Sequence, residues 1–352
     1  MSPAGLFSLR PGYDITRVIR GGWQLAGGHG NIDRRKALAD LTNSAEAGIL
    51  TFDCADIYTG VEELFGLFRS DYARRHGSEA AKSIKLHTKF VPDLDILPVI
   101  TKMHVRTIID RSLKRLGMDR LDLVQFHWWD YEIPGCIETA VWLEELKEEG
   151  KIDRLGGTNF DTAHTRELIA AGMDLVSMQV QYSLLDARPE NGLVDFCRAS
   201  DVYLLCYGSV AGGFLSDHWI GKPEPRPSFE NRSLVKYKLI IDDFGGWELF
   251  QDLLHTLRSI ADRHGVDIAT VASRAILERP QVAAVIIGAR NDAHLAGNLR
   301  VVHIALSPAD HDEIADVLAQ RRGPGGDTFS LERDRRGRHG AIMKYNLSRQ
   351  AS

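Results

Sequence analysis

Three short apolar segments, LTFDC (50–54), IKLHTKF (84–90) and LDLVQFHW (121–128), follow one another along the chain, and longer segments separate them. Between the second and the third, apolar residues recur at helical spacing from 105 to 116, and a glycine follows directly. Short β-branched or aromatic segments that alternate with helices are typical of βα units around a parallel sheet.

Further segments continue this alternation along the chain. The additional candidate strands are a segment near 16–22, RLGGTN (154–159), DLVSMQVQY (174–182), VYLLCYG (202–208) and AAVIIGA (283–289). Helices are expected at 33–47, 137–149 and 161–171. Eight strands with intervening helices predict an α/β fold of the (β/α)8 TIM-barrel type. An open doubly wound sheet is the alternative, but no GxGxxG turn follows the first strand, so the barrel is favoured.

The 352 residues suffice for one barrel with additions. We expect the barrel domain to cover residues 1–322 and a C-terminal extension to cover 323–352. Residues 209–245 are too long for an ordinary βα loop and contain several prolines and glycines, which predicts a lid or binding loop. The extension is basic and glycine-rich, so it is either a disordered tail or an ordered strap across the barrel.

The charged residues argue against several classes of partner. The formal net charge is −5, and acidic and basic residues are interspersed, so we expect neither nucleic acid nor a membrane as a partner. The four cysteines are widely spaced without a CxxC pair, which indicates no disulfide framework and no metal site. The chain start has no apolar segment typical of a signal peptide, so a cytoplasmic protein is expected. The sequence indicates no oligomeric state.

Four polar residues are expected on one rim of the barrel, because the carboxyl ends of the strands line the active site of this fold. Asp53, Lys89 and His127 end three consecutive predicted strands, and Tyr58 follows Asp53 by five residues. Reduction of a carbonyl group needs hydride at carbon and a proton at oxygen. Tyr58 can supply the proton, Lys89 can stabilise phenolate, Asp53 can hold Lys89, and His127 can donate a hydrogen bond to the carbonyl oxygen. The hydride must come from a cofactor.

Each of these residues also has a purely structural interpretation. A Lys–Asp pair at a strand end is often an ion pair without further function, a tyrosine in a loop often only packs, and a histidine beside tryptophans is often buried and satisfied. The joint occurrence on consecutive strand ends is what favours catalysis.

The same residues carry a family resemblance. The segments TFDCADIY (51–58), HTKF (87–90) and SLKRLGMDRLDLVQFHW (112–128) resemble motifs of the aldo-keto reductases, which are NAD(P)H-dependent carbonyl reductases built on a (β/α)8 barrel. The resemblance implies that Asp53, Tyr58, Lys89 and His127 form the catalytic set, in agreement with the roles assigned above.

The resemblance also implies a cofactor site. Thr158 and Asn159, in GKIDRLGGTNF, and Gln179 would hydrogen-bond the nicotinamide carboxamide, Tyr207 would stack on the ring, and the loop at 208–215 would wrap the pyrophosphate. Thr158 stands where family members commonly have Ser, and its hydroxyl keeps the contact. The residues implied in cofactor binding are Gly22, Trp23, Asp53, Thr158, Asn159, Gln179, Tyr207, Gly208, Ser209, Val210, Gly212, Leu215, Gly288, Ala289, Arg290, His294 and Asn298.

The segment IIGARNDAHLAGNL (286–299) resembles the family's site for the adenosine 2′-phosphate and adenine. His294 stands where many members have Arg, whereas Asn298 is kept. Arg290 still offers a guanidinium for a phosphate, so NADP(H) is favoured and NAD(H) is the alternative.

The expected substrate is a small-molecule carbonyl compound. Trp23, Tyr58, His127 and Trp128 are expected to contact it, with Trp129 and Trp219 as further candidates. Aromatic walls suit an aldose or keto-sugar, which we favour, and equally aromatic or terpenoid carbonyls. A cofactor-binding regulatory subunit with little turnover, and a non-redox barrel that binds phosphorylated metabolites, are the alternatives.

Overall fold

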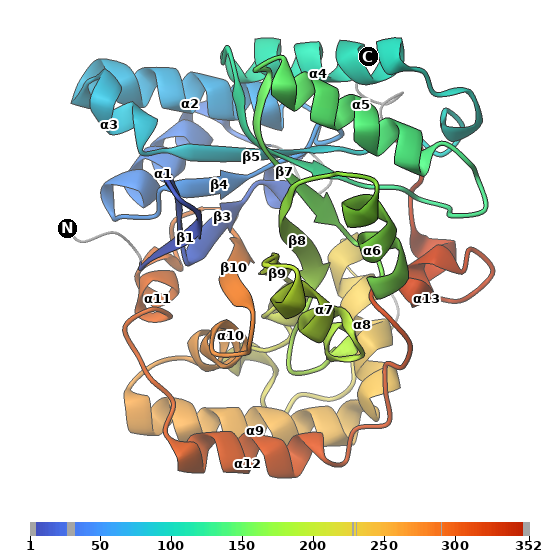
Figure 1. Ribbon diagram of the computed structural model, residues 1–352. Helices are drawn as coiled ribbons and strands as arrows, with labels where there is room; N and C mark the ends of the chain where they lie inside the picture. The colour runs from blue at the N-terminus through green and yellow to red at the C-terminus, as the bar shows by residue number, and fades with distance from the viewer. Residues whose placement is uncertain (1–4, 27–31, 227–228, 230, 290, 348–352) are drawn as a thin grey trace.

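Eight parallel strands form a closed barrel, which confirms the predicted (β/α)8 fold (Figure 1). The computed structural model describes residues 5–26, 32–226, 229, 231–289 and 291–347. Around the barrel, each strand pairs with the next in sequence, and the last strand closes on the first. The strands are β3 (Val18–Gly21), β4 (Thr51–Asp53), β5 (Lys85–Phe90), β6 (Leu121–Phe126), β7 (Ile152–Thr158), β8 (Leu175–Gln181), β9 (Tyr203–Tyr207) and β10 (Val282–Gly288).

Helices surround the barrel. The helices predicted from the sequence are confirmed as α1 (Arg34–Glu46), α4 (Lys102–Leu116), α5 (Cys136–Glu148) and α6 (Thr162–Ala170). The structure adds α2 (Val61–His76), α3 (Ser78–Lys82), α7 (Leu193–Ala199), α9 (Trp247–His264), α10 (Ile268–Leu277), α11 (Leu295–Arg300) and α12 (Pro308–Leu318). Side-chain caps explain several starts: Asp33, Thr101 and Asp161 accept hydrogen bonds from backbone N–H groups in the first turns of α1, α4 and α6. No helix among the described residues is long and apolar enough to cross a membrane.

An N-terminal hairpin, absent from the sequence prediction, closes the bottom of the barrel. Its strands β1 (Leu6–Arg10) and β2 (Tyr13–Thr16) pair antiparallel. Leu9, Tyr13 and Ile15 are buried in one cluster with barrel residues such as Leu123 and Leu205. Since apolar side chains fill this end, a ligand has to enter at the carboxyl ends of the strands.

The segment 209–245, which was expected to be a lid or binding loop, contributes residues to the wall of the main cavity and is partly helical. It contains short 3₁₀ turns at Ala211–Gly213 and Asp217–Trp219, followed by the helix α8 (Arg232–Phe244). Asn231 caps this helix, and its buried face consists of Tyr237, Ile240, Ile241 and Phe244. That helical periodicity was present in the sequence, but the preceding prolines and glycines obscured it.

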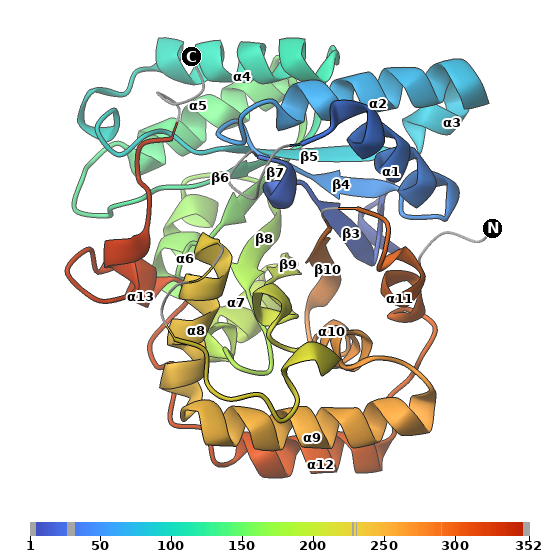
Figure 2. The same ribbon diagram turned by 180° about the vertical axis from the view of Figure 1, so that it is seen from behind.

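Of the two alternatives for the C-terminal extension, the described residues form the ordered strap. It contains α13 (Ser330–Arg333) and a 3₁₀ turn at Gly340–Ile342. Early in the strap, Asp327 accepts a hydrogen bond from the backbone of α6 at Thr162, and later Leu94 donates from the loop after β5 to the Tyr345 carbonyl. The strap therefore runs along one side of the barrel mouth, and Figure 2 shows it rising from α12 past α13 toward α4 and α5.

Candidate active site

A cavity of about 860 Å³ lies at the carboxyl ends of the strands. Strand ends, the loops after β3, β9 and β10, the helix α8 and the strap all contribute to its wall. This is the end at which active sites occur in this fold, and the volume is in the range of known small-molecule sites. All four candidate catalytic residues, Asp53, Tyr58, Lys89 and His127, line the cavity.

Asp53 and Lys89 form a buried ion pair. Lys89 Nζ donates to Asp53 Oδ2 over 2.5 Å and to the Cys54 carbonyl over 2.7 Å. The other carboxylate oxygen of Asp53 accepts hydrogen bonds from Gln125 Nε2 at 2.8 Å and Gln179 Nε2 at 2.7 Å. Burial opposes the charge of Lys89, but Asp53 raises the pKa of Lys89 above its usual value. The pair therefore keeps a fixed ammonium beside the cavity.

Tyr58 lies next to this ammonium. Lys89 Nζ is 5.3 Å from the centroid of the Tyr58 ring, and Trp23 packs against the ring at 5.0 Å. Burial raises the pKa of Tyr58 above its usual value, and the charge of Lys89 lowers it without reversing that rise. Lys89 was expected to make the phenol more acidic than a free one, and burial outweighs that effect here. At neutral pH Tyr58 consequently holds its proton, as a proton donor must.

His127 has a defined tautomer. Its Nδ1 lies 3.0 Å from the carbonyl oxygen of Thr158, and a carbonyl oxygen only accepts, so Nδ1 carries a proton. Burial, assisted by the charge of Arg333, lowers the pKa of His127 to about 3. A neutral ring with its proton on Nδ1 leaves Nε2 as an acceptor, and Nε2 has no partner among the described residues. The expectation that His127 donates a hydrogen bond to the carbonyl oxygen is therefore corrected: in this state Nε2 can only accept one.

The residues expected around the nicotinamide lie together in the cavity wall. Thr158, Asn159, Gln179 and Tyr207 line it. The Tyr207 hydroxyl donates to Asn159 Oδ1 over 2.9 Å, which fixes the ring, while the Thr158 hydroxyl donates to the Gln179 carbonyl over 3.2 Å. Asn159 occupies the left-handed region with a φ of 62°, a conformation that Asn tolerates better than most residues.

Most of the loop after β9 faces the cavity. Gly208, Val210, Gly212 and Leu215 line it, whereas Ser209 is buried behind it and lies 3.2 Å from the hydroxyl of Ser273. Both glycines have positive φ, and a Cβ at Gly208 or Gly212 would lie 2.5 or 2.7 Å from Tyr237 of α8. The loop thus needs glycine because α8 packs directly on it. A cofactor contact by Ser209 would have to involve its backbone.

Gly22 also lies outside the cavity wall among the described residues, whereas its neighbour Trp23 lines the cavity. A Cβ at Gly22 would lie 2.8 Å from the side chain of Val61 on α2. The glycine therefore allows the end of β3 to pack closely against α2.

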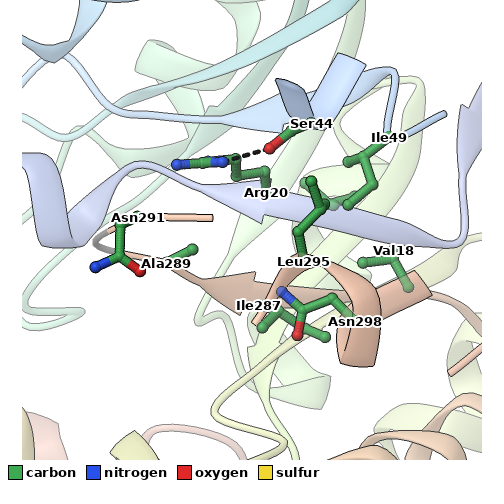
Figure 3. A pocket seen from close by; sticks show the side chains of 10 residues that line it. Val18, Arg20, Ser44, Ile49, Ile287, Ala289, Asn291, Leu295 and Asn298 are labelled. Atoms are coloured by element: carbon green, nitrogen blue, oxygen red, sulfur yellow. Dashed lines mark hydrogen bonds between the residues drawn. The ribbon is translucent and has the colours of Figure 1, made fainter. Parts of the chain in front are cut away.

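The loop after β10 forms the far end of the cavity. Gly288, Ala289, His294 and Asn298 line it, and Arg290 falls outside the described residues. Ala289 and Asn298 are shared with a small adjoining pocket between β3, α1 and the residues after β10 (Figure 3).

Arg20, which the sequence analysis missed, lies in that small pocket. Its guanidinium donates to the Asp40 carbonyl over 2.8 Å and to the Ser44 hydroxyl, and Nε and Nη2 have no partner among the described residues. The carboxylates of Asp40 and Asp292 lie close enough to oppose the loss of its charge on burial. Arg20 stands out only because two of its nitrogen atoms are buried without a partner among the described residues, and the sequence alone does not show burial.

The two neighbouring tryptophans after β6 have different places. Trp128 was expected to contact substrate, but it is completely buried, donates to the Ile133 carbonyl over 3.1 Å and does not line the cavity. Trp129 lines the cavity and packs edge-on against His127 at 4.3 Å. Trp219 packs against Phe214 at 4.9 Å instead of lining the cavity. The chain leaves the strand at Phe126, so strand alternation no longer predicts which side chain faces the mouth.

The strap and α8 supply site residues that the sequence analysis did not identify. Phe329 packs edge-on against His127 at 5.6 Å, and Lys236 of α8 also lines the cavity. Arg333 donates to the Asn159 carbonyl over 2.8 Å and to the Tyr131 hydroxyl over 2.6 Å. Clustered aromatic and basic residues after 328 were the available signal. Among the described residues, no group of His, Cys, Asp or Glu is arranged to hold a metal ion.

Comparison with known proteins relates the chain to one family. Residues 17–319 match the model of the aldo/keto reductase family. The chain is 26% identical over 321 residues to the NADH-specific methylglyoxal reductase of Escherichia coli, covering 86% of this chain and 96% of that protein. It is 28% identical over 308 residues to the aldo-keto reductase yakc [NADP(+)] of Schizosaccharomyces pombe, covering 82% and 85%. A glycerol dehydrogenase from Gluconobacter oxydans has the same fold, with a TM-score of 0.74, 21% identity, and coverage of 90% of this chain and 95% of that one.

Proposed function

The chain belongs to the aldo/keto reductase family, and we propose that it reduces an aldehyde or ketone to the alcohol with hydride from NADPH, with Tyr58 as the proton donor. The observation that carries this proposal is the buried Asp53–Lys89 pair beside the ring of Tyr58 in the wall of the cavity. This arrangement places a protonated phenol and a fixed positive charge where the oxygen of a carbonyl compound can bind.

The cavity has the features that a nicotinamide cofactor requires. An aromatic ring at Tyr207 and the amide of Asn159 lie at one end, and the glycine-containing loop after β9 lies along the wall. When bound, NADPH supplies the hydride. Its carboxamide would be held by Thr158, Asn159 and Gln179. Tyr207 would stack on one face of the nicotinamide ring and leave the other face open to the substrate.

The chain's own residues account for the proton. Tyr58 donates a hydrogen bond to the carbonyl oxygen and transfers its proton as negative charge develops there. Lys89 stabilises the resulting phenolate, and Asp53 together with Gln125 and Gln179 keeps Lys89 in place. The raised pKa of Tyr58 keeps the donor protonated at neutral pH.

His127 orients the substrate as an acceptor. Because Nε2 of the neutral ring has no partner among the described residues, a hydroxyl group on the substrate would satisfy it. A carbonyl compound with a hydroxyl next to the carbonyl, such as an aldose or keto-sugar, matches a donor at Tyr58 and an acceptor at His127.

The choice of NADPH over NADH rests on Arg290, which the family resemblance assigns to the 2′-phosphate. Arg20 is buried near the same loop, but Asp40 and Asp292 offset its charge, so we do not assign the phosphate to it. One relative is named NADH-specific and another NADP(+), so the assay has to compare both cofactors.

The test is a panel of aldehydes, ketones and sugars, each assayed with NADPH and with NADH by the loss of reduced-cofactor absorbance. We expect steady turnover, faster with NADPH and fastest with hydroxylated carbonyl compounds. Tight cofactor binding without turnover would instead identify a regulatory subunit. The absence of tryptophan fluorescence quenching by either cofactor would overturn the redox assignment, because Trp23 and Trp129 line the cavity.

A further inference from the structure

Lys236 is a lysine of α8 that faces the active-site cavity and has almost no polar partner. Its side chain is 16% exposed, and its Nζ lies 5.2 Å from the centroid of the Tyr207 ring and 5.7 Å from that of Phe329. Both rings belong to the cavity wall. Aromatic faces stabilise an ammonium partly, but they accept none of its three N–H bonds in the way an oxygen does.

The carboxylate nearest to Lys236 is already engaged. Glu332 of the strap lies 3.6 Å from Lys236 Nζ, beyond hydrogen-bonding distance. Arg188 donates to both oxygens of Glu332, over 2.7 and 3.0 Å, and also binds Asp186. Burial opposes ionisation of Glu332, but Lys236 and Arg188 lower the pKa of Glu332 to about 2, so the carboxylate stays charged.

This network anchors the strap and leaves unused donors at the cavity. The carboxylates of Asp186 and Glu332 balance the charges of Arg188 and Lys236. Arg188, however, makes the hydrogen bonds to both carboxylates. Burial lowers the pKa of Lys236 below its usual value, with Glu332 opposing it. The ammonium of Lys236 is only partly exposed and its one ion-pair partner lies 3.6 Å away, so an oxygen anion in the cavity that accepts from it would be stabilising.

We propose that Lys236 binds a carboxylate carried by the substrate, so that the preferred substrates are carbonyl compounds with a carboxylate remote from the reacting carbonyl. This inference rests on the proposed reductase function. It adds a second recognition point, on α8, to the proton donor at the strand ends.

The position of Lys236 favours the substrate over the cofactor as the source of the anion. Lys236 lies near the ring of Tyr207, which is proposed to stack on the nicotinamide, and near Phe329, which packs against His127, so the ammonium lies between the proposed positions of the nicotinamide and the substrate. The cofactor's phosphates are instead assigned to the loop after β9 and to the residues after β10. The nicotinamide carboxamide is neutral and needs no ammonium.

The same surroundings favour a carboxylate over a phosphate. A phosphate carries more charge than one lysine can balance and is commonly held by several donors. Here Glu332 lies 3.6 Å from Lys236 Nζ, and it would repel a dianion more strongly than a single negative charge.

The test compares para-carboxybenzaldehyde with benzaldehyde, and with para-formylphenyl phosphate, in the wild-type protein and in Lys236→Met. We expect the wild type to prefer the carboxylated aldehyde in kcat/KM. In Lys236→Met this preference, taken as the ratio of the two kcat/KM values, should fall by about 10- to 100-fold, the effect of losing a charged hydrogen bond.

The matched control is Lys238→Met, which removes the same charge from the same helix. Lys238 pairs with Glu224 at 2.6 Å and with Asp242, and it does not line the cavity. This control should keep the wild-type preference. A further measurement needs no variant: in the wild-type protein with cofactor, benzoate should inhibit at about 10-fold lower concentration than benzamide.

Several outcomes would overturn the assignment. Equal kcat/KM for the carboxylated and neutral aldehydes, equal inhibition by benzoate and benzamide, or a preference for the phosphate compound would each exclude a carboxylate site. Weaker cofactor binding in Lys236→Met, measured by fluorescence quenching, would assign Lys236 to the cofactor. If no aldehyde is reduced at all, the proposed function itself fails, which is a different result from turnover without preference.

Discussion

Replacing Lys89 by Met would leave the carboxylate of Asp53 buried without its counter-ion. Removing one partner of a buried ion pair commonly costs about 3–5 kcal/mol. In this protein Gln125 and Gln179 would still donate to one oxygen of Asp53, at 2.8 and 2.7 Å. We therefore expect Lys89→Met to lower the free energy of unfolding by about 3 kcal/mol, near the lower end of this range. The rate of carbonyl reduction should also fall, because nothing would stabilise phenolate at Tyr58.

A double variant separates the two effects. In Asp53→Asn with Lys89→Met the uncompensated charge is gone, so most of the lost stability should return, whereas activity should stay low. Urea unfolding would measure the first quantity, and steady-state reduction of a simple aldehyde would measure the second. The reasoning is refuted if Lys89→Met is destabilised by less than about 1 kcal/mol, or if the double variant is no more stable than Lys89→Met.

Three further predictions follow from the proposed site. Tyr58→Phe should lower the reduction rate by about 10²- to 10⁴-fold while the Kd for NADPH, measured by fluorescence quenching, stays the same; an active variant would exclude Tyr58 as the acid. Nitrogen NMR should find His127 protonated on Nδ1 and uncharged from pH 8 down to about pH 4, because its pKa is lowered to about 3, whereas a proton on Nε2 would contradict the acceptor role. Arg290→Ala should raise the Kd for NADPH much more than that for NADH, and equal changes would show that Arg290 does not bind the 2′-phosphate.

The barrel and the residues at its strand ends could be predicted because they depend on local pattern. Strand composition fixes where each strand ends, and parallel strands bring those ends to one rim. Asp53 and Lys89 therefore had to be close, and they meet at 2.5 Å. The protonation state of His127 could not be read in this way, since it depends on the carbonyl of Thr158 and on the degree of burial.

The parts that could not be predicted are those held by contacts between distant segments. Arg188 and Glu332 are 144 residues apart in sequence, and no local pattern relates them. The tautomer of His127, the position of Lys236 at 3.6 Å from Glu332 and the exclusion of Trp128 from the cavity likewise follow only from assembled packing. For that reason the positions of the strand-end residues were predictable, and the part of the cavity wall that α8 and the strap form was not.

The strap influences the protonation of His127, a residue that the barrel contributes to the site. Arg333 of the strap donates a hydrogen bond to the Asn159 carbonyl, and its charge adds to the effect of burial in lowering the pKa of His127. Phe329 of the strap and Trp129 of the barrel pack edge-on against the imidazole. Without the strap the pKa of His127 should be lowered less, because the charge of Arg333 and part of the burial would be lost. The C-terminal extension thus helps to keep His127 uncharged, while the acceptor character of Nε2 follows from the contact between Nδ1 and the Thr158 carbonyl in the barrel.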